Sequence, residues 1–250
     1  MTQIAKTALI TGANGGIGRA LVRVFHDAGY RIIATDMAAQ PQDLHCACYL
    51  QADLTRFVED EAYANEVISA IRNTLQGSRL NILINNAAIQ ILGGAESLTR
   101  QDWRTTLDVN LLAPFLLTQA LLPALEAAKG CVVNIGSIHA RLTKKNFVAY
   151  ATSKAALAGM TRALAVDLGP LVRINAIEPA AIETAMLKAG FARKPELYAQ
   201  LEQCHPQQRV GQSEEVAHLA LAITDGGMNF LHGACIGLDG GISGRLLDPD

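Results

Sequence analysis

Residues 6–18, KTALITGANGGIG, decide the fold that this sequence predicts. Residues 6–11 form a short β-type run, a glycine-rich turn follows at once, and a helical pattern covers residues 19–28. Glycines let the backbone turn tightly and approach a pyrophosphate, and the first turn of the following helix presents free N–H groups with a partial positive charge. The stretch therefore predicts a phosphate site made by Gly12, Asn14, Gly15, Gly16, Ile17 and Gly18.

A second β-type run, residues 30–35, ends in Asp36. A carboxylate at the end of the second strand, about twenty residues beyond the glycines, is placed to accept hydrogen bonds from the hydroxyls of an adenosine ribose. The same carboxylate would repel a 2′-phosphate, and Asn14, not Lys or Arg, stands at the variable position of the glycine turn. The expected cofactor is therefore NAD(H) rather than NADP(H).

The rest of the chain alternates between the same two kinds of pattern. Further β-type runs lie at residues 45–51, 80–84, 131–136, 172–177 and 235–238, and helical patterns lie at 56–75, 102–125, 150–168 and 213–224. This alternation, without repeats or low-complexity linkers, predicts an α/β fold: one doubly wound parallel sheet of the Rossmann type, in a single domain over residues 1–250. Residues 185–210, irregular in pattern, are expected to form a mobile segment that covers a site.

Polar side chains follow several of the predicted strands at the point where each strand ends. In an open parallel sheet, ligands bind beyond the carboxyl ends of the strands. Asp53 and Leu54 follow the third predicted strand, Asn85-Asn86-Ala87-Ala88 the fourth, Ser137 the fifth, and residues 178–184 the sixth. These residues are therefore expected to share one edge of the sheet.

Tyr150 and Lys154 stand four residues apart at the start of an Ala-rich helical pattern. Residues at i and i+4 lie on the same face of a helix, so the Lys154 ammonium can lie close to the Tyr150 phenol. A neighbouring cation favours the phenolate and lowers its pKa from about 10 toward the working range. Such pairs are also common on solvated helix faces, and the other motifs of the chain decide in favour of a proton shuttle.

Composition excludes several classes of function. The 250 residues carry a formal net charge of −2, so no basic surplus indicates nucleic acid. The five cysteines lack the spacing of a disulfide framework or a zinc site, and reduced thiols in a cytoplasm are expected, with no metal. Residues 111–128 approach membrane hydrophobicity but contain Pro114, Pro123 and Glu126, which favours a helix buried in protein.

Taken together, these motifs resemble the short-chain dehydrogenase/reductase family over nearly the whole chain. The marks are TGANGGIG at residues 11–18, Asp53, NNAA at 85–88, Asn110, Ser137, Tyr150 with Lys154, residues 179–184, and Leu238-Asp239-Gly240-Gly241. Several ordered motifs at the family's spacing are far more specific than any one of them.

The resemblance implies hydride transfer between a nicotinamide and an alcohol or carbonyl group. In that family Tyr150 would give or take the hydroxyl proton, Ser137 would hydrogen-bond the substrate oxygen, and Lys154 would bind the nicotinamide ribose and lower the pKa of Tyr150. Asn110 would hold a water that links Lys154 to solvent. The cofactor-binding residues that it implies, besides the glycine turn and Asp36, are Asp53, Leu54, Asn86, Ala87, Ala88, Tyr150, Lys154, Pro179, Ile182 and Thr184.

Two positions depart from the family pattern. Ala88 stands where the family usually has the Gly of NNAG, and Ala180 stands where it usually has the Gly of a Pro-Gly pair. A methyl group replaces hydrogen at two places where backbone lies against the cofactor, so the nicotinamide pocket is expected to be tighter or shifted.

The substrate is expected to be small and polar, a hydroxy acid or a sugar or polyol. Gln90 and His139 occupy places similar to those of hydroxybutyrate dehydrogenases, where such residues contact a carboxylate, although Phe147 stands where those enzymes carry a Lys. Arg141, Lys144 and Lys145 lie in the loop that leads to Tyr150, and a solvated loop remains an alternative interpretation of all these side chains. The substrate residues predicted are Gln90, His139, Arg141 and Lys144.

Two other functions stay open at this point. One is reduction of acyl-carrier-protein thioesters, which usually uses NADPH and is therefore disfavoured by Asp36. The other is a nucleotide-binding regulatory or scaffold protein without turnover, which would have no use for Ser137, Tyr150, Lys154 and Asn110. The apolar helices at 111–125 and after Tyr150 offer more apolar surface than one sheet face needs, and the family implies a homo-oligomer, usually a tetramer and otherwise a dimer.

Overall fold

The computed structural model describes residues 5–192 and 194–246, and within them the main sheet has seven parallel strands. Their spatial order is β3-β2-β1-β4-β5-β6-β9, so the chain reverses its direction of travel across the sheet between β3 and β4. The strands are β1 (Thr7–Thr11), β2 (Arg31–Asp36), β3 (Cys48–Gln51), β4 (Ile82–Asn85), β5 (Cys131–Ile135), β6 (Arg173–Pro179) and β9 (Cys235–Leu238). The doubly wound parallel sheet predicted from the sequence is confirmed.

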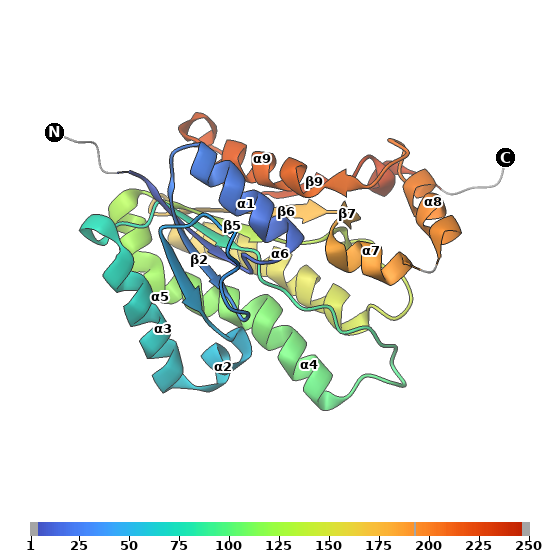
Figure 1. The fold of residues 1–250 in the computed structure, drawn as a ribbon, viewed down its shortest axis with the longest axis horizontal. Helices are drawn as coiled ribbons and strands as arrows, with labels where there is room; N and C mark the ends of the chain where they lie inside the picture. The colour runs from blue at the N-terminus through green and yellow to red at the C-terminus, as the bar shows by residue number, and fades with distance from the viewer. Residues whose placement is uncertain (1–4, 193, 247–250) are drawn as a thin grey trace.

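Helices cover both faces of this sheet (Figure 1). On one face, α1 (Gly16–Asp27) and α9 (Ser213–Thr224) pack on alternate strand residues such as Ile10 and Ile32. On the other, α3 (Glu61–Thr74), α5 (Ala113–Ala128) and α6 (Val148–Leu168) pack on Leu9 and Ile33. Because both faces are buried, the inner strands β1, β4 and β5 are fully buried and mostly apolar, as is typical of a parallel sheet.

The helix predicted over residues 56–75 is two helices in the structure, α2 (Leu54–Glu59) and α3. Asp60 has an extended backbone, and its carboxylate accepts a hydrogen bond from the backbone N–H of Tyr63, which caps the start of α3. A residue that caps one helix ends the one before it, so the single-helix prediction was wrong.

The long apolar helical segment runs from Arg100 to Ala128, as α4 (Arg100–Leu107), a π-helical turn at Asp108–Leu112, and α5. It is the one helix in the described part of the chain long and apolar enough to cross a membrane. Ala113, Leu117, Leu121 and Leu125 pack against the sheet, which agrees with the expectation of a helix buried in protein. Part of its apolar surface remains uncovered in the single chain.

The prediction of irregular structure over 185–210 was wrong, because this segment contains α7 (Ala185–Phe191) and α8 (Pro195–Cys204). Thr184 caps α7 and Pro195 occupies the first turn of α8, where its missing N–H is harmless. A two-stranded parallel sheet, β7 (Ile182–Glu183) with β8 (Gly211–Gln212), joins the two ends of the segment. The two helices lie beyond the carboxyl ends of the main strands (Figure 1).

Candidate active site

The structure brings Ser137, Tyr150 and Lys154 together beyond the carboxyl end of β5. Ser137 stands two residues after the last residue of β5, is 6% exposed, and accepts a hydrogen bond at Oγ from the backbone N–H of His139 at 3.1 Å. Tyr150 and Lys154 lie one turn apart near the start of α6, and Lys154 Nζ is 5.7 Å from the centre of the Tyr150 ring. The i, i+4 spacing seen in the sequence thus places phenol and ammonium on the same side of the helix.

Burial raises the pKa of the Tyr150 phenol above its usual 10, and the hydrogen bond with Ser137 offsets part of that rise. The expectation that Lys154 lowers this pKa is therefore not met in the protein chain by itself. Loss of water around the phenol favours its neutral form, and the Lys154 ammonium donates its hydrogen bond to the Ile135 carbonyl.

Lys154 is 3% exposed, and its ammonium donates a hydrogen bond to the Ile135 carbonyl at 2.8 Å. The desolvation of this charge lowers the pKa of Lys154 from 10.5 to about 8. At neutral pH the group is mostly protonated and can still act as a cation beside Tyr150. The last residue of β5 therefore fixes the direction in which the ammonium points.

Asn110 lies in the π-helical turn, where it connects two other parts of the site. Its Oδ1 accepts a hydrogen bond from the Ile89 N–H, and its Nδ2 donates to the Ile89 carbonyl and to Ser153 Oγ. Ser153 Oγ donates in turn to the Tyr150 carbonyl at 2.7 Å. Asn110 thus joins the loop after β4 to the N-terminal part of α6, and the water expected at Asn110 stays a prediction.

In the glycine turn between β1 and α1, three glycines lie so close to neighbouring atoms that a side chain would not fit. Gly12 has φ +64°, and a Cβ there would lie 2.7 Å from Ala87 Cα. A Cβ on Gly18 would lie 2.0 Å from the Gly12 carbonyl oxygen, and one on Gly16 would lie 2.8 Å from Thr184 Cγ2. The N-terminus of α1 has no side-chain cap at Gly15, so its first N–H groups stay free for an anion.

Asp36, at the end of β2, lies beside this turn. Its carboxylate accepts hydrogen bonds from the backbone N–H groups of Asn14 at 3.0 Å and Ala38 at 3.0 Å. The Asn14 amide group donates to Tyr49 Oη and to the Ala39 carbonyl, and its Oδ1 is buried without a partner. The geometry fixes the orientation of the carboxylate and suits a ligand with hydroxyl groups.

The other predicted cofactor residues surround the same strand ends. The side chain of Asn86 donates to the carbonyls of Thr11 and Gly12, which ties the turn after β4 to the glycine turn. Asp53 caps α2 by accepting from the N–H groups of Thr55 and Arg56, so the structure shows it in a helix cap. Pro179 ends β6, Leu54 begins α2, Ala87 and Ala88 follow Asn86, Ile182 lies in β7, Thr184 precedes α7, and Ile17 lies in the first turn of α1.

Ala88 and Ala180, which replace the usual glycines, need no special backbone. Neither belongs to the non-glycine residues with positive φ in the described part of the chain, which are Ser78, Lys129, Asn146 and Gln208. The methyl groups are therefore accommodated without backbone strain.

The predicted substrate residues are only partly gathered at Tyr150. The His139 ring stacks on Phe147 with 4.4 Å between ring centres and meets Tyr150 edge-on at 5.7 Å. Burial and the nearby Lys144 lower the pKa of His139 to about 4, so its imidazole is neutral at physiological pH. Gln90 is exposed, Lys144 Nζ lies over the Phe147 ring, and the Arg141 guanidinium contacts Glu178.

Sequence reasoning missed a buried polar ladder beneath the site. Asn85 Nδ2 donates to Asn134 Oδ1 at 2.8 Å, and Asn134 Nδ2 donates to Thr161 Oγ1 at 2.9 Å. The sequence did contain an indication of these hydrogen bonds, because Asn134 interrupts an apolar strand and Thr161 stands seven residues after Lys154 on the same helix. The ladder ties β4, β5 and α6 together close to the catalytic groups.

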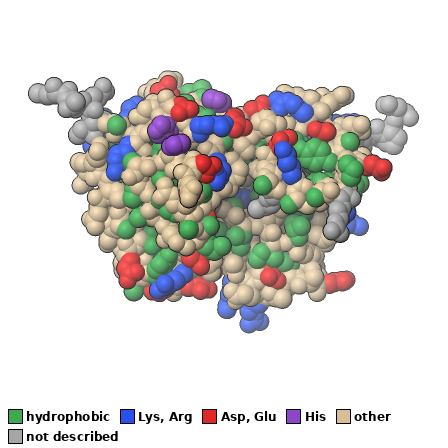
Figure 2. Space-filling view, viewed as in Figure 1, with side chains coloured by type: hydrophobic (Ala, Val, Ile, Leu, Met, Phe, Trp, Pro, Cys, Tyr) green, Lys and Arg blue, Asp and Glu red, His purple; other side chains and the backbone are tan. Residues whose placement is uncertain are grey.

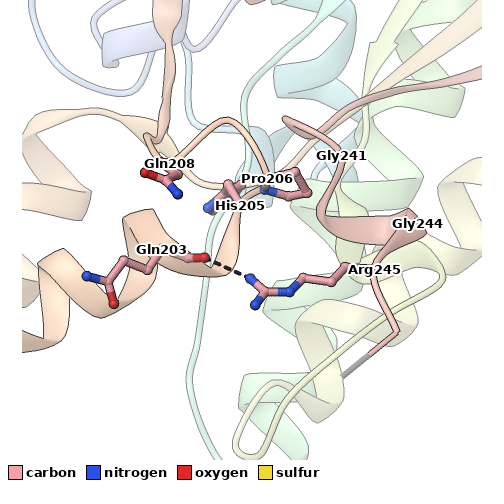
Figure 3. Close-up of a pocket in the computed structure, with 7 residues that line it drawn as sticks. All are labelled: Gln203, His205, Pro206, Gln208, Gly241, Gly244 and Arg245. Carbon is pink, nitrogen blue, oxygen red and sulfur yellow. Dashed lines mark hydrogen bonds between the residues drawn. The ribbon is translucent and has the colours of Figure 1, made fainter. Parts of the chain in front are cut away.

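A cavity of about 430 Å³ lies elsewhere, between the end of α8 and the C-terminal segment (Figure 3). It is lined by Gln203, His205, Pro206, Gln208, Gly241, Gly244 and Arg245, none of them a predicted site residue. Arg245 donates to the carbonyl of Gln203, which holds the C-terminal segment against α8. The face shown in Figure 2 is also hollowed between the α1 side and the α7–α8 side, and acidic and basic side chains are mixed over it.

Comparison with known proteins agrees with this geometry. A family model described as enoyl-(acyl carrier protein) reductase matches residues 12–243. The chain is 36% identical to protein FixR of Bradyrhizobium diazoefficiens, over 94% of this chain and 86% of that protein. It is 33% identical to D-threitol dehydrogenase of Mycolicibacterium smegmatis, over 94% of this chain and 92% of that protein.

A solved structure shares the whole architecture. Ligand-free aldohexose dehydrogenase of Thermoplasma acidophilum superposes with a TM-score of 0.90 at 30% identity, over 98% of this chain and 97% of that one. Fold, motifs and relatives converge, and this chain belongs to the short-chain dehydrogenase/reductase family, as an oxidoreductase that acts on CH–OH groups.

Proposed function

We propose that the protein is an NAD(H)-dependent dehydrogenase that interconverts a secondary alcohol and a carbonyl on a small polyhydroxylated or hydroxy-acid substrate. The observation that carries this proposal is the convergence of Ser137, Tyr150 and buried Lys154 beyond the carboxyl end of β5. A relative similar in sequence is named for D-threitol, and a solved structure with the same fold is named for aldohexoses.

The residues present fit a dinucleotide. The glycine turn leaves room where Cβ atoms would collide with backbone, the N-terminus of α1 is uncapped, and Asp36 is oriented by two N–H groups. Gly12 to Gly18 would hold the pyrophosphate, Asp36 the adenosine ribose, and Lys154 the nicotinamide ribose. When bound, the nicotinamide supplies the hydride acceptor for alcohol oxidation and the hydride donor for the reverse reaction.

Side chains of the protein transfer the hydroxyl proton and bind the substrate oxygen. In alcohol oxidation, the phenolate form of Tyr150 takes the hydroxyl proton at Oη while Ser137 Oγ hydrogen-bonds the same substrate oxygen. The Lys154 ammonium stabilises negative charge on Tyr150 Oη in the transition state, in surroundings from which water is largely excluded. In the reverse direction Tyr150 Oη returns the proton.

A carboxylate at Asp36 favours NAD(H), because a 2′-phosphate would face it directly. Catalytic efficiency with NAD and NADP is to be compared for the wild type and for Asp36→Ala. We expect the wild type to prefer NAD and the variant to lose most of that preference. A wild type that works better with NADP would overturn the cofactor assignment.

The substrate class is tested with a panel of polyols, aldohexoses, hydroxy acids, plain secondary alcohols and a 3-oxoacyl thioester, followed by absorbance of the reduced nicotinamide. A polar group left unpaired by an apolar substrate costs about 1–3 kcal/mol, so polyols or hydroxy acids should be preferred. His139→Ala and Gln90→Ala should raise KM for these substrates more than for plain alcohols. A preference for long-chain alcohols or for the thioester would reject the proposed class.

A further inference from the structure

Glu178 is a buried carboxylate for which the reaction described above has no use. Among the Asp, Glu, Lys and Arg residues of the described chain, only Lys154 and Glu178 are buried, at 3% and 1% exposure. Removing a carboxylate from water costs free energy unless a partner compensates its charge. Lys154 belongs to the proposed proton transfer, and the position of Glu178 therefore needs an explanation of its own.

The side chain of Glu178 lies against the residue that precedes Ser137. Gly136 donates its N–H to the Ile177 carbonyl at 2.7 Å, which aligns the end of β5 with the end of β6. A Cβ built on Gly136 would lie 3.2 Å from Glu178 Cγ and 3.0 Å from the Ile177 oxygen. Glu178 therefore supports the backbone from which Ser137 projects.

The partner of Glu178 comes from the turn on the other side of Ser137. Arg141 Nε lies 2.9 Å from Glu178 Oε2, as an ion pair rather than an aligned hydrogen bond. Arg141 also donates its backbone N–H to Ile138 at the end of the 3₁₀ turn Ile138–Ala140. A Cβ on Gly237 would lie 3.3 Å from Arg141 Nη2, so the guanidinium also reaches β9.

The Arg141–Glu178 ion pair lies at the start of the segment that connects Ser137 to Tyr150. Residues 141–146 are all exposed, and they connect the Ser137–His139 turn to Tyr150. Hydrogen bonds also hold this segment at both ends. Leu142 N–H donates to the Ile138 carbonyl, a hydrogen bond joins Thr143 Oγ1 to His139 Nδ1, and Gly93 N–H donates to the Asn146 carbonyl. The contact with buried Glu178 is the ion pair that anchors the start of this segment within the described residues.

We propose that Glu178 and Arg141 form a positioning pair that holds residues 137–139 at a fixed position relative to Tyr150. Neither side chain contacts the substrate. The proposal rests on the proposed dehydrogenase function and replaces the role of substrate ligand expected for Arg141. The two roles differ in what they predict. A positioning pair acts on kcat with every substrate, whereas a substrate ligand acts on KM with carboxylates.

The test uses full-length protein with Glu178→Gln, which removes the charge and keeps the volume, and with Arg141→Ala, Arg141→Lys and the double variant. Misplacement of a catalytic group by about 1 Å costs about 10²-fold, so kcat should fall by about 10-fold to 100-fold with polyols and hydroxy acids alike. Arg141→Lys should recover part of the loss, and the double variant should be no worse than the poorer single variant. NADH affinity should stay within about twofold of the wild-type value, because these substitutions change no contact of the glycine turn or of Asp36.

Arg23→Ala is the matched control, since it breaks the exposed Arg23–Glu214 pair between α1 and α9 and should leave kcat unchanged. Hydrogen exchange of the protein without substrate supplies a measurement that does not depend on turnover. Peptides covering residues 138–147 should exchange faster in Glu178→Gln and Arg141→Ala than in the wild type and in Arg23→Ala. If the wild type turns over no substrate in the panel, the proposed function fails while this exchange result still decides the pairing.

Three results would each overturn the positioning role. The first is unchanged kcat in Arg141→Ala, whose exposed side chain can be removed even if Glu178→Gln does not fold. The second is a rise in KM confined to carboxylate substrates, which makes Arg141 a substrate ligand. The third is unchanged exchange of residues 138–147 in both single variants.

Discussion

Tyr150 and Ser137 lie where we propose that the substrate oxygen binds. Removing the single oxygen atom of the Tyr150 side chain tests the role of Tyr150 apart from that of Ser137. Tyr150→Phe deletes the phenolic hydroxyl and keeps the ring that meets His139 and Phe147. Turnover should fall by about 10²–10⁴-fold or more, because acid–base catalysis is lost, while NADH binding stays nearly the same. Steady-state kinetics and a fluorescence titration with NADH measure the two quantities. Near-normal turnover of this variant with a good substrate would reject Tyr150 as the proton-transfer group.

The lowered pKa of the single residue Lys154 predicts that the stability of the folded protein depends on pH. Its pKa is about 8 in the folded chain and 10.5 ordinarily, a difference that corresponds to about 3 kcal/mol. Between these values the unfolded chain binds more protons, so the contribution of Lys154 to stability rises as pH rises from about 8 to 10.5, and the full penalty is present below pH 8. Relative to Lys154→Met, the wild type should therefore gain stability across this window.

Urea unfolding of both proteins at pH 7 and pH 9.5 measures this change. Met cannot donate to the Ile135 carbonyl, but that loss is the same at both pH values and leaves the difference intact. A stability difference that does not change with pH would show that the ammonium is not desolvated in the folded protein.

At the scale of single elements, the turn between β1 and α1 offers a matched pair of substitutions. A Cβ on Gly18 would lie 2.0 Å from the Gly12 carbonyl oxygen, whereas one on Gly15, with φ −69°, meets nothing closer than 3.5 Å. Gly18→Ala should therefore destabilise the protein by about 3 kcal/mol or more and weaken NADH binding, because backbone has to move. Gly15→Ala should change stability by at most about 1 kcal/mol. Thermal unfolding and NADH titration of both variants provide the check, and equal stabilities would contradict it.

The elements also show what the sequence could and could not predict. The strands and the residues that follow them were predictable, because buried parallel strands are continuous apolar runs and ligand groups gather at their carboxyl ends. The break at Asp60 was not recognised, because its cap on Tyr63 competes with a helical pattern that continues on both sides. The helices α7 and α8 were missed because residues 185–210 are irregular in pattern, and Pro195 stands in the first turn of α8, where a proline does not break a helix.

Long-range pairing was the other part that the sequence could not supply. Glu178 and Arg141 stand 37 residues apart and meet only because β5 and β6 are neighbours in the sheet. The glycine turn and the residues that follow the neighbouring strands were predictable residue by residue, since their motifs are local. The electrostatics of Tyr150 were not, because burial depends on every element packed around the ring.

At the scale of the whole molecule, the uncovered apolar surface of the Arg100–Ala128 helical segment predicts association. Leu112 on this segment is 40% exposed, and Val166 on α6 is 85% exposed. Exposed apolar surface of this extent is typical of contacts between subunits. We expect a tetramer, or else a dimer, by light scattering at micromolar concentration. A monomer under those conditions would show that these helices serve the core alone.

The strand order carries a consequence for how the chain is made. β1 lies inside the sheet and pairs with β2 and β4, and β5, β6 and β9 are then added one after another to the same growing edge. A ribosome releases the chain amino end first, so the glycine turn is complete before Tyr150 has been synthesised. Until β9 arrives, each nascent chain presents the open edge of β4, β5 or β6, with unpaired backbone groups that invite pairing with other chains. Protection during synthesis should therefore matter most while the catalytic half is still emerging.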